Sequence, residues 1–392
     1  MQPRIHPKAT LTPFEWYRDM RDKEPVVYDE VRQMWHVFRY TDVGRVLTNH
    51  RLFSSDRSWL VQQKQQVSLK RYTSIIGIDP PQHRELRSHM AQEFTPSMIS
   101  RLDPHIRKVA WSLLGPLLER TKIELVEELA YPLPILSIAH LLGVPSEDCP
   151  QLKAWADKLV SGNFETIGQN ASERHKVTLE MAHYFKTILQ QRIATPRHDL
   201  ISHLLAVQGQ GKPIEEDDLI AFCILLLIAG HETTTCLIGN IMLCLDERPE
   251  LWTALQLHRE LVPAAVEEIL RFYAPLKAVT RVTTTEVAFG EYTIPAHQPI
   301  CAWVGSANRD ERQFPNPDVV DFQRDLRRHM GFGLGIHFCL GSALARLETK
   351  IVLELLLEHV ADFHCLQEPA LQPLESLMLF GVKRLPLELQ RR

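Results

Sequence analysis

The chain has 392 residues, of which 45% are hydrophobic and 23% charged, close to the composition of soluble globular proteins. Forty-four basic side chains stand against 48 acidic ones, which gives a formal net charge of −4. That balance disfavours a general nucleic-acid binder, which needs a basic excess on one face. The composition also excludes a disordered, collagen-like or coiled-coil chain.

The cysteines and the amino terminus indicate the compartment. Seven cysteines occur without any CxxC pair, which is typical of free thiols in a reducing environment. Residues 1–7 have no apolar stretch of the kind found in signal peptides and anchors, and the longest apolar run, 219–229, is about half the length that a bilayer needs. We therefore expect a cytoplasmic protein without a membrane anchor.

Strand-like runs at 26–28 and 35–38 come first along the chain, and Asp42 helps to open a helix at 40–42. The polar, aperiodic segment 58–76 predicts a long loop, and loops of that length are usually functional. Apolar residues spaced by three or four then predict helices over 106–120, 149–160, 173–192 and 216–246.

The last third of the chain mixes β and helical patterns. A β segment covers 279–300, a Pro/Asn/Asp-rich stretch covers 308–321, and apolar residues spaced from 340 to 355 predict a final long helix. No linker separates these parts. We therefore expect one domain over residues 1–392, mainly α with a minor β portion.

Glycine is scarce, with 17 residues, yet Gly331, Gly333, Gly335 and Gly341 fall close together around Cys339. Glycines at alternate positions let the backbone turn tightly or approach a flat partner closely. Cys339 is expected at the start of the following helix, where backbone N–H groups and the helix dipole favour a thiolate.

A thiolate in this setting is either a nucleophile or a metal ligand. A nucleophile needs a base, and His337, two residues away, is a weak candidate for one. A lone cysteine without other ligands at zinc spacing does not make a zinc site. One thiolate is enough where a macrocycle supplies the other ligands, as in haem held by cysteine.

This segment is similar to a known signature: the haem-binding motif of the cytochrome P-450 monooxygenases resembles the run Phe332-Gly333-Leu334-Gly335-Ile336-His337-Phe338-Cys339-Leu340-Gly341. The resemblance implies a single-domain cytochrome P-450 fold that holds haem b between the long central helix and the helix following Cys339. It implies that Cys339 is the axial iron ligand and that Phe332 and Gly333 contact the cofactor.

The predicted helix over 216–246 contains the run Ala229-Gly230-His231-Glu232-Thr233-Thr234, which is poor helix-forming sequence. Thr233 can donate to the carbonyl of Ala229 and bend the helix. His231 begins a zinc-protease-like pattern, but the motif needs a second His at position 235, which is Thr. Taken alone, the segment fits a packed core helix with unusual polar residues.

Beside Cys339, the same segment resembles the oxygen-activating segment of the family. That resemblance implies that Glu232 is the acid and Thr233 the alcohol of proton delivery, with Ala229 and Gly230 against the haem. The alcohol argues against the peroxide-using relatives, which lack it.

Two further pairs match the family. Glu268 and Arg271 form either an ordinary surface pair or the family's structural Glu-x-x-Arg pair, which locks to an arginine in the Pro-rich segment; Arg324 is preferred for that arginine over Arg309. His83 and Arg87 lie one helical turn apart. Such a pair usually faces solvent, but the family uses these positions to bind the haem propionates, together with residues matched here by Arg281 and His337.

The family geometry implies a substrate pocket built from 59–76, 161–168, 225–233, 276–280 and 379–380. Its mostly apolar lining implies a lipophilic substrate such as a fatty acid, terpenoid, steroid or polyketide, and the candidate residues are Leu226, Ala229, Leu276, Lys277, Val279 and Phe380. The ammonium group of Lys277 either anchors a carboxylate or points to solvent.

The resemblance therefore implies a monomeric, haem-dependent monooxygenase that hydroxylates or epoxidises such a molecule, using O2 and electrons from a ferredoxin and its reductase. The basic run 324–329 is either a solvated charge run or a ferredoxin-docking surface that includes Arg327 and Arg328. The alternatives are a haem-thiolate isomerase, dehydratase or nitric-oxide reductase, and a non-catalytic haem-binding protein.

Overall fold

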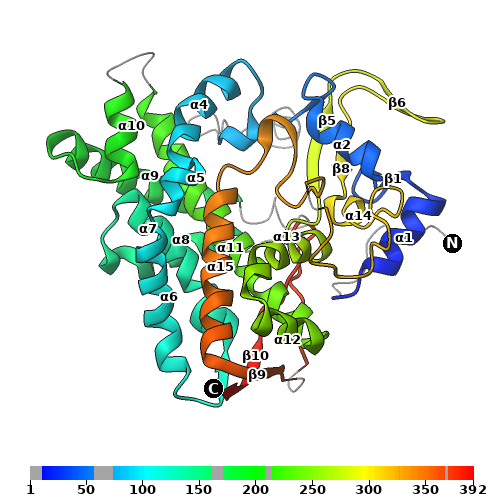
Figure 1. The fold of residues 1–392 in the computed structure, drawn as a ribbon. Helices are drawn as coiled ribbons and strands as arrows, with labels where there is room; N and C mark the ends of the chain where they lie inside the picture. Colours follow the sequence, from blue (N-terminus) through cyan, green and yellow to red (C-terminus); the bar gives the residue numbers. More distant parts are fainter. Residues whose placement is uncertain (1–10, 57–73, 161–170, 209–213, 326, 367–369) are drawn as a thin grey trace.

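The computed structural model describes residues 11–56, 74–160, 171–208, 214–325, 327–366 and 370–392 (Figure 1). The α-helices within these ranges are α1 (Phe14–Lys23), α2 (Tyr40–Thr48), α4 (Gln82–Met90), α5 (Pro96–Ser100), α6 (Asp103–Leu117), α7 (Pro132–Leu142), α8 (Cys149–Val160), α9 (Ala171–Ala194), α10 (Leu200–Gln208), α11 (Glu216–Asp246), α12 (Pro249–Leu257), α13 (Val262–Phe272), α14 (Val304–Ala307) and α15 (Ser342–His359). The strands are β1 (Val26–Asp29), β2 (Met34–Val37), β3 (Phe53–Ser54), β4 (Lys122–Glu124), β5 (Val279–Thr283), β6 (Val287–Phe289), β7 (Tyr292–Ile294), β8 (Pro299–Ala302), β9 (Val360–Cys365) and β10 (Pro386–Arg391).

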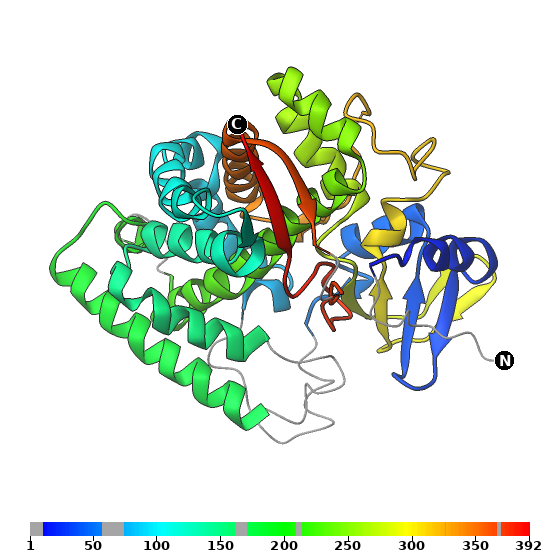
Figure 2. The same cartoon turned by 90° about the horizontal axis from the view of Figure 1, so that it is seen from below.

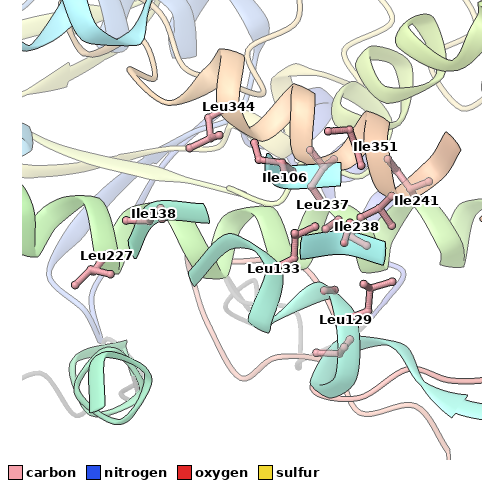
Figure 3. Packing of buried hydrophobic residues seen from close by; sticks show 14 of the residues in the cluster. Ile106, Leu129, Leu133, Ile138, Leu227, Leu237, Ile238, Ile241, Leu344 and Ile351 are labelled. Atoms are coloured by element: carbon pink, nitrogen blue, oxygen red, sulfur yellow. The ribbon is translucent and has the colours of Figure 1, made fainter. Parts of the chain in front are cut away.

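Helix α11 forms the centre of the helical part of the molecule. Three acidic residues, 216–218, occupy its first turn, where carboxylates stabilise the positive end of a helix. It packs against α7, α9 and α15, and Figure 3 shows Leu237, Ile238 and Ile241 of α11 among apolar side chains of neighbouring helices. Burial of each such side chain contributes about 2 kcal/mol, so packing on several sides stabilises this helix.

Among the described residues, α11 is also the one helix that is long and apolar enough to cross a bilayer. However, 67% of its most apolar window is buried inside the protein. Its apolar surface is covered by other helices, as expected for the core helix of a globular fold.

The strands form small sheets at the edges of the helical part. One sheet has the order β1-β2-β8-β5-β3, with β2 and β8 parallel and its other pairs antiparallel. Figures 1 and 2 show it with α1, α2 and α14 on one side of the molecule, while α6 to α10 lie on the other. The order β4-β10-β9 makes a second sheet, and β6 and β7 form a hairpin.

The mainly α fold with a minor β portion is confirmed, and the helices predicted over 149–160 and 216–246 have the same bounds as α8 and α11. The sequence pattern does not predict the β4-β10-β9 sheet. Strand β4 has only three residues, and Ile123 pairs with Leu387 near the other end of the chain. Such a short, distant pairing leaves no local alternation to recognise.

Helix α15 carries a buried acid, Glu348. Its side chain is 1% exposed, and Oε1 has no hydrogen-bond partner in the part of the chain that the structure describes. The Ser137 hydroxyl donates to the carbonyl oxygen of Leu133 at 2.9 Å, and a hydrogen bond between Ser137 and Glu348 only partly opposes the effect of burial on the carboxyl. Burial raises the pKa of Glu348 to about 8, and the carboxyl is therefore mainly protonated at neutral pH.

We expect Glu348 to make the folded protein less stable as the pH rises. Its folded-state pKa of about 8 lies above the ordinary value of 4.5. The contribution of Glu348 to the free energy of unfolding is therefore fully present below about pH 4.5 and is lost as the pH rises toward 8. The loss is about 1.4 kcal/mol per pH unit in that window. Thermal unfolding of Glu348→Gln and parent, at about pH 5 and about pH 8, tests this: the mutant should lose less stability between the two. Equal losses would contradict it.

Candidate functional site

The glycine cluster forms a closed loop in front of α15. The backbone N–H of Cys339 donates to the carbonyl oxygen of Phe332 at 2.8 Å. Gly333 and Gly335 adopt left-handed φ values of 72° and 69°, which disfavour residues with a side chain. A Cβ on Gly335 would also lie 2.8 Å from the carbonyl oxygen of Leu47 in α2. The loop therefore needs glycine both for its turn and for its close contact with α2.

The thiol of Cys339 is held as a thiol by its surroundings. Burial raises its pKa, against the opposing effects of the Gly341 N–H group and the guanidinium groups of Arg87 and Arg346. The prediction that the helix start favours a thiolate is therefore wrong for the metal-free thiol. Helix α15 begins only at Ser342, and desolvation outweighs the neighbouring donors. A bound metal cation reverses that preference.

Four predicted carboxylate-binding residues meet beside the loop. The rings of His83 and His337 have centroids 4.3 Å apart, and Arg87 donates from Nη2 to the carbonyl oxygen of Phe338 at 2.5 Å. Arg281, in β5, is buried and donates to the Thr280 carbonyl oxygen at 2.9 Å. Burial, with the charges of Arg281, His83 and Arg87, lowers the pKa of His337 to about 3.

This cluster presents donors suited to an anion. His83 is 2% exposed, yet its Nε2 atom has no hydrogen-bond partner among the described residues. An unpaired buried nitrogen costs free energy unless a ligand satisfies it. Two imidazoles and two guanidinium groups are the donors that a pair of carboxylates prefers, so the residues fit the propionates of haem.

The polar segment of α11 has the local geometry that the sequence predicts. Thr233 donates to the Ala229 carbonyl oxygen at 2.9 Å, and Thr234 donates to the Gly230 carbonyl oxygen at 3.0 Å. A Cβ on Gly230 would lie 2.5 Å from Cδ1 of Ile138. Gly230 therefore permits close packing of α11 against α7, a reason that the sequence does not reveal.

Glu232 and His231 differ in their surroundings. Glu232 is half-buried, and burial together with the charge of Asp157 raises its pKa to about 7. His231 is buried, its Nδ1 lies 2.6 Å from the Leu227 carbonyl oxygen, and its ring packs edge-on to Tyr131. Within the described ranges, no group of three or more His, Cys, Asp or Glu side chains could hold a metal ion.

The Glu-x-x-Arg pair forms a buried ion triad. Arg271 donates from Nε and Nη2 to the two oxygens of Glu268, each at 2.8 Å, and Arg324 donates from Nε to Oε1 at 3.1 Å. Arg309 instead lies against the rings of Phe14 and Phe272, 3.8 and 3.9 Å from their centroids. Arg324 is therefore the arginine that reaches Glu268. The triad also ties the loop preceding the glycine cluster to α13, since Arg271 donates to the carbonyl oxygens of residues 308 and 317.

The predicted pocket segments are described only in part. Residues 57–73 and 161–170, which include most of the predicted loop over 58–76 and all of 161–168, lie outside the described residues. Of the six candidate lining residues, five are partly or fully exposed: Leu226, Ala229, Leu276, Lys277 and Val279.

Phe380 and Lys277 differ from the other candidate lining residues, Phe380 in its burial and Lys277 in its charge. Phe380 is buried, and its ring stacks on Tyr273 at a centroid distance of 5.3 Å. Lys277 is half-buried and donates from Nζ to the carbonyl oxygen of Ser376 at 2.7 Å. Burial lowers the pKa of Lys277 to about 8.

Comparison with known proteins decides the family. A family model for Cytochrome P450 matches residues 135–390. This chain is a cytochrome P450. It is 38% identical to Cytochrome P450 109 of Bacillus spizizenii, over 97% of this chain and 93% of the relative. It is also 38% identical to the erythromycin C-12 hydroxylase of Saccharopolyspora erythraea, over 95% of this chain and 93% of that enzyme.

The solved structures agree with this. The cytochrome P450 CYP109E1 from Bacillus megaterium, in complex with testosterone, matches with a TM-score of 0.90 at 38% identity, covering 96% of this chain and 98% of that chain. Membership of the family makes the protein a haem b enzyme and a monooxygenase, as the resemblance implied.

Three residues of this cytochrome P450 site escape sequence reasoning: Ser55, Asp79 and Arg346. The Ser55 hydroxyl lies 2.9 Å from Nε2 of His337, and Asp79 accepts from the Ser55 backbone N–H at 3.1 Å. The Arg346 guanidinium lies over the Phe332 ring, 4.3 Å from its centroid. Arg346 lies one or two turns into the helix after Cys339, so helical spacing is a signal that could have found it. Ser55 gives no comparable signal.

Proposed function

We propose that this cytochrome P450 hydroxylates or epoxidises a lipophilic small molecule of steroid or macrolide type, with O2 and electrons from a ferredoxin and its reductase. The observation that carries the proposal is the pairing of a thiol loop with an acid and an alcohol on α11. Relatives whose names specify a ligand or reaction point the same way: one hydroxylates erythromycin and another was solved with testosterone.

Cys339 would hold the iron, and His83, Arg87, Arg281 and His337 would hold the propionates. Phe332, Gly333, Ala229 and Gly230 would contact the macrocycle. Bound haem supplies the oxygen-activating chemistry, and a thiolate ligand favours O–O cleavage. The ion triad of Glu268, Arg271 and Arg324 would act structurally, by fixing the chain that leads into the thiol loop.

Glu232 and Thr233 of α11 would deliver the protons that oxygen activation needs. A pKa of about 7 lets Glu232 both lose and regain a proton near neutral pH, which is the condition for efficient general acid–base catalysis. The Thr233 hydroxyl donates to the Ala229 carbonyl oxygen at 2.9 Å. Its oxygen can accept a further hydrogen bond, and rotation away from Ala229 would let the hydroxyl donate its proton.

The substrate would lie along the apolar face of α11 that includes Leu226 and Ala229, opposite Leu276 and Val279. Phe380 would support this wall from behind, because it is buried against Tyr273. Lys277 is a poor carboxylate anchor, since its ammonium group already binds the Ser376 carbonyl oxygen. A neutral lipophile therefore fits this lining better than a fatty acid.

The competing functions lack specific support. A haem-thiolate isomerase or dehydratase needs no proton delivery by Thr233, and a haem carrier needs neither Glu232 nor Thr233. We also propose that the enzyme is a cytoplasmic monomer; its seven cysteines are free thiols, as expected in a reducing compartment.

A steroid and macrolide panel, headed by testosterone and erythromycin, tests the function. Binding is expected to shift the haem iron from low to high spin, and the compounds that shift it should raise O2 consumption in the presence of a ferredoxin, its reductase and a reductant. Spin shifts without any substrate-dependent O2 consumption would favour the isomerase, dehydratase or carrier alternatives.

The electron donor is expected to dock at the basic run before Cys339. Fewer basic side chains of this run are available to a partner than its sequence suggests, because Arg324 binds Glu268 and His329 lies 3.0 Å from Glu267. Arg327 is 88% exposed and pairs with Asp325, and Arg328 is exposed. These two arginines are the members of the run that can meet an acidic ferredoxin.

We expect Arg327→Glu with Arg328→Glu to slow first-electron transfer from an acidic ferredoxin by about tenfold at low salt, and less at high salt, where charges are screened. Stopped-flow reduction at two ionic strengths measures this. Lys108→Glu with Lys176→Glu makes the same change in net charge on α6 and α9 and is the control. Equal slowing by both double mutants would exclude a local docking site.

A further inference from the structure

Ser55 lies where three parts of the carboxylate-binding cluster meet. It follows β3, whose Ser54 pairs with Val282 next to Arg281 in β5. Its side chain is 2% exposed, and its hydroxyl oxygen lies 2.9 Å from Nε2 of His337. A buried hydroxyl at this distance limits the orientations that the imidazole ring can take.

Asp79 fixes Ser55 to the helix that carries His83 and Arg87. Its Oδ1 atom accepts from the backbone N–H of Ser55 at 3.1 Å, and its Oδ2 atom accepts from the hydroxyl of Ser54. The carbonyl oxygen of Asp79 accepts from the backbone N–H of His83 at 3.1 Å. Asp79 therefore joins the end of β3 to the start of α4, and the position of Ser55 is set from both sides.

We propose that Ser55 is a positioning residue that, held by Asp79, directs the ring of His337 toward a haem carboxylate. The hydroxyl occupies Nε2 in either charge state of the ring, as donor to a neutral imidazole or acceptor from a charged one. When Ser55 donates to Nε2 of a neutral ring, and when it accepts from a charged ring, Nδ1 carries the N–H that can bind the carboxylate. This inference rests on the proposed role of His337 in haem binding and adds the residue that orients it.

The test is the rate of haem transfer from the ferric holoenzyme to excess apomyoglobin. Ser55→Ala should lose haem about fivefold faster, the factor expected for one ordinary hydrogen bond. Ser55→Thr keeps the hydroxyl and should restore most of the parent rate. The haem propionate bending band in resonance Raman spectra should shift in Ser55→Ala and return in Ser55→Thr, which a general loosening of the fold would not produce.

Ser54→Ala is the matched control, because the Ser54 hydroxyl binds Asp79, whereas the hydroxyl beside His337 is that of Ser55. It should leave haem loss within about twofold of the parent and the propionate band in place. An effect of Ser54→Ala as large as that of Ser55→Ala would overturn the inference, because the loss would then come from the β3–α4 connection.

His337→Ala separates this inference from the proposed haem site. Faster haem loss in His337→Ala, with parent-like behaviour of Ser55→Ala, would overturn the positioning role alone. Parent-like haem retention in His337→Ala would overturn the proposed carboxylate contact itself, and the role of Ser55 with it.

Discussion

Cys339→Ser is expected to abolish the red-shifted Soret band of the ferrous carbon monoxide complex and all monooxygenase activity. A serine hydroxyl keeps the size of the side chain but does not supply the soft, electron-donating sulfur on which the spectrum and O–O cleavage depend. The loop itself should survive, because Cys339 is held by its backbone N–H, which donates to Phe332 at 2.8 Å. Absorbance of the reduced, carbon monoxide-treated protein measures the result.

Cys149→Ser is the control for a general effect of losing a thiol. Cys149 is buried at the start of α8, away from the thiol loop in sequence and in fold, and its replacement should leave the band unchanged. A red-shifted band in Cys339→Ser would mean that another residue is the iron ligand.

Thr233→Ala is expected to keep reductant consumption near the parent rate while the yield of oxidised product per reductant falls by about a hundredfold, the low end for lost proton transfer. The missing electrons should appear as hydrogen peroxide. The hydroxyl is the group that would pass a proton from Glu232, and alanine removes it without filling the space. Product, peroxide and reductant measured in one reaction give the partition.

Two variants make this result specific. Thr234→Ala removes a neighbouring hydroxyl with the same backbone contact one residue on, at 3.0 Å to Gly230, but Thr234 is buried and should not affect the yield. Thr233→Ser retains the hydroxyl and should keep most of it. A parent-like yield in Thr233→Ala would remove Thr233 from proton delivery.

The sequence predicts the local geometry correctly where the interacting residues lie close together in the chain. The thiol loop, the Thr233 back-bond and the Glu268–Arg271 pair each lie within a few residues, so residue type and spacing predict their geometry. The choice of Arg324 over Arg309 also agrees with the structure, in which Arg324 donates to Glu268 at 3.1 Å.

The failures share one physical cause, which is that burial depends on distant contacts. The sequence predicts that the pKa of Cys339 is lowered, but it is raised, because desolvation outweighs the local helix dipole. The contact of Ser55 with His337 joins residues 282 positions apart, and the approach of Ile138 to Gly230 joins α7 to α11. No local pattern encodes such contacts.

The same limit applies to the basic run. Its sequence suggests four basic groups on one surface, but Arg324 and His329 turn toward Glu268 and Glu267. A carboxylate partner far along the chain decides whether a basic side chain is available to another protein.

Isotope labelling tests the proposed reaction most directly. The parent enzyme, supplied with a ferredoxin, its reductase, a reductant and the panel compound that gives the largest spin shift, is run under 18O2, and the product is weighed by mass spectrometry. A monooxygenase places one atom of 18O in each product molecule and sends the other to water. A product without the label, or no product despite substrate binding, would contradict the assignment of this cytochrome P450 as a monooxygenase of lipophilic molecules.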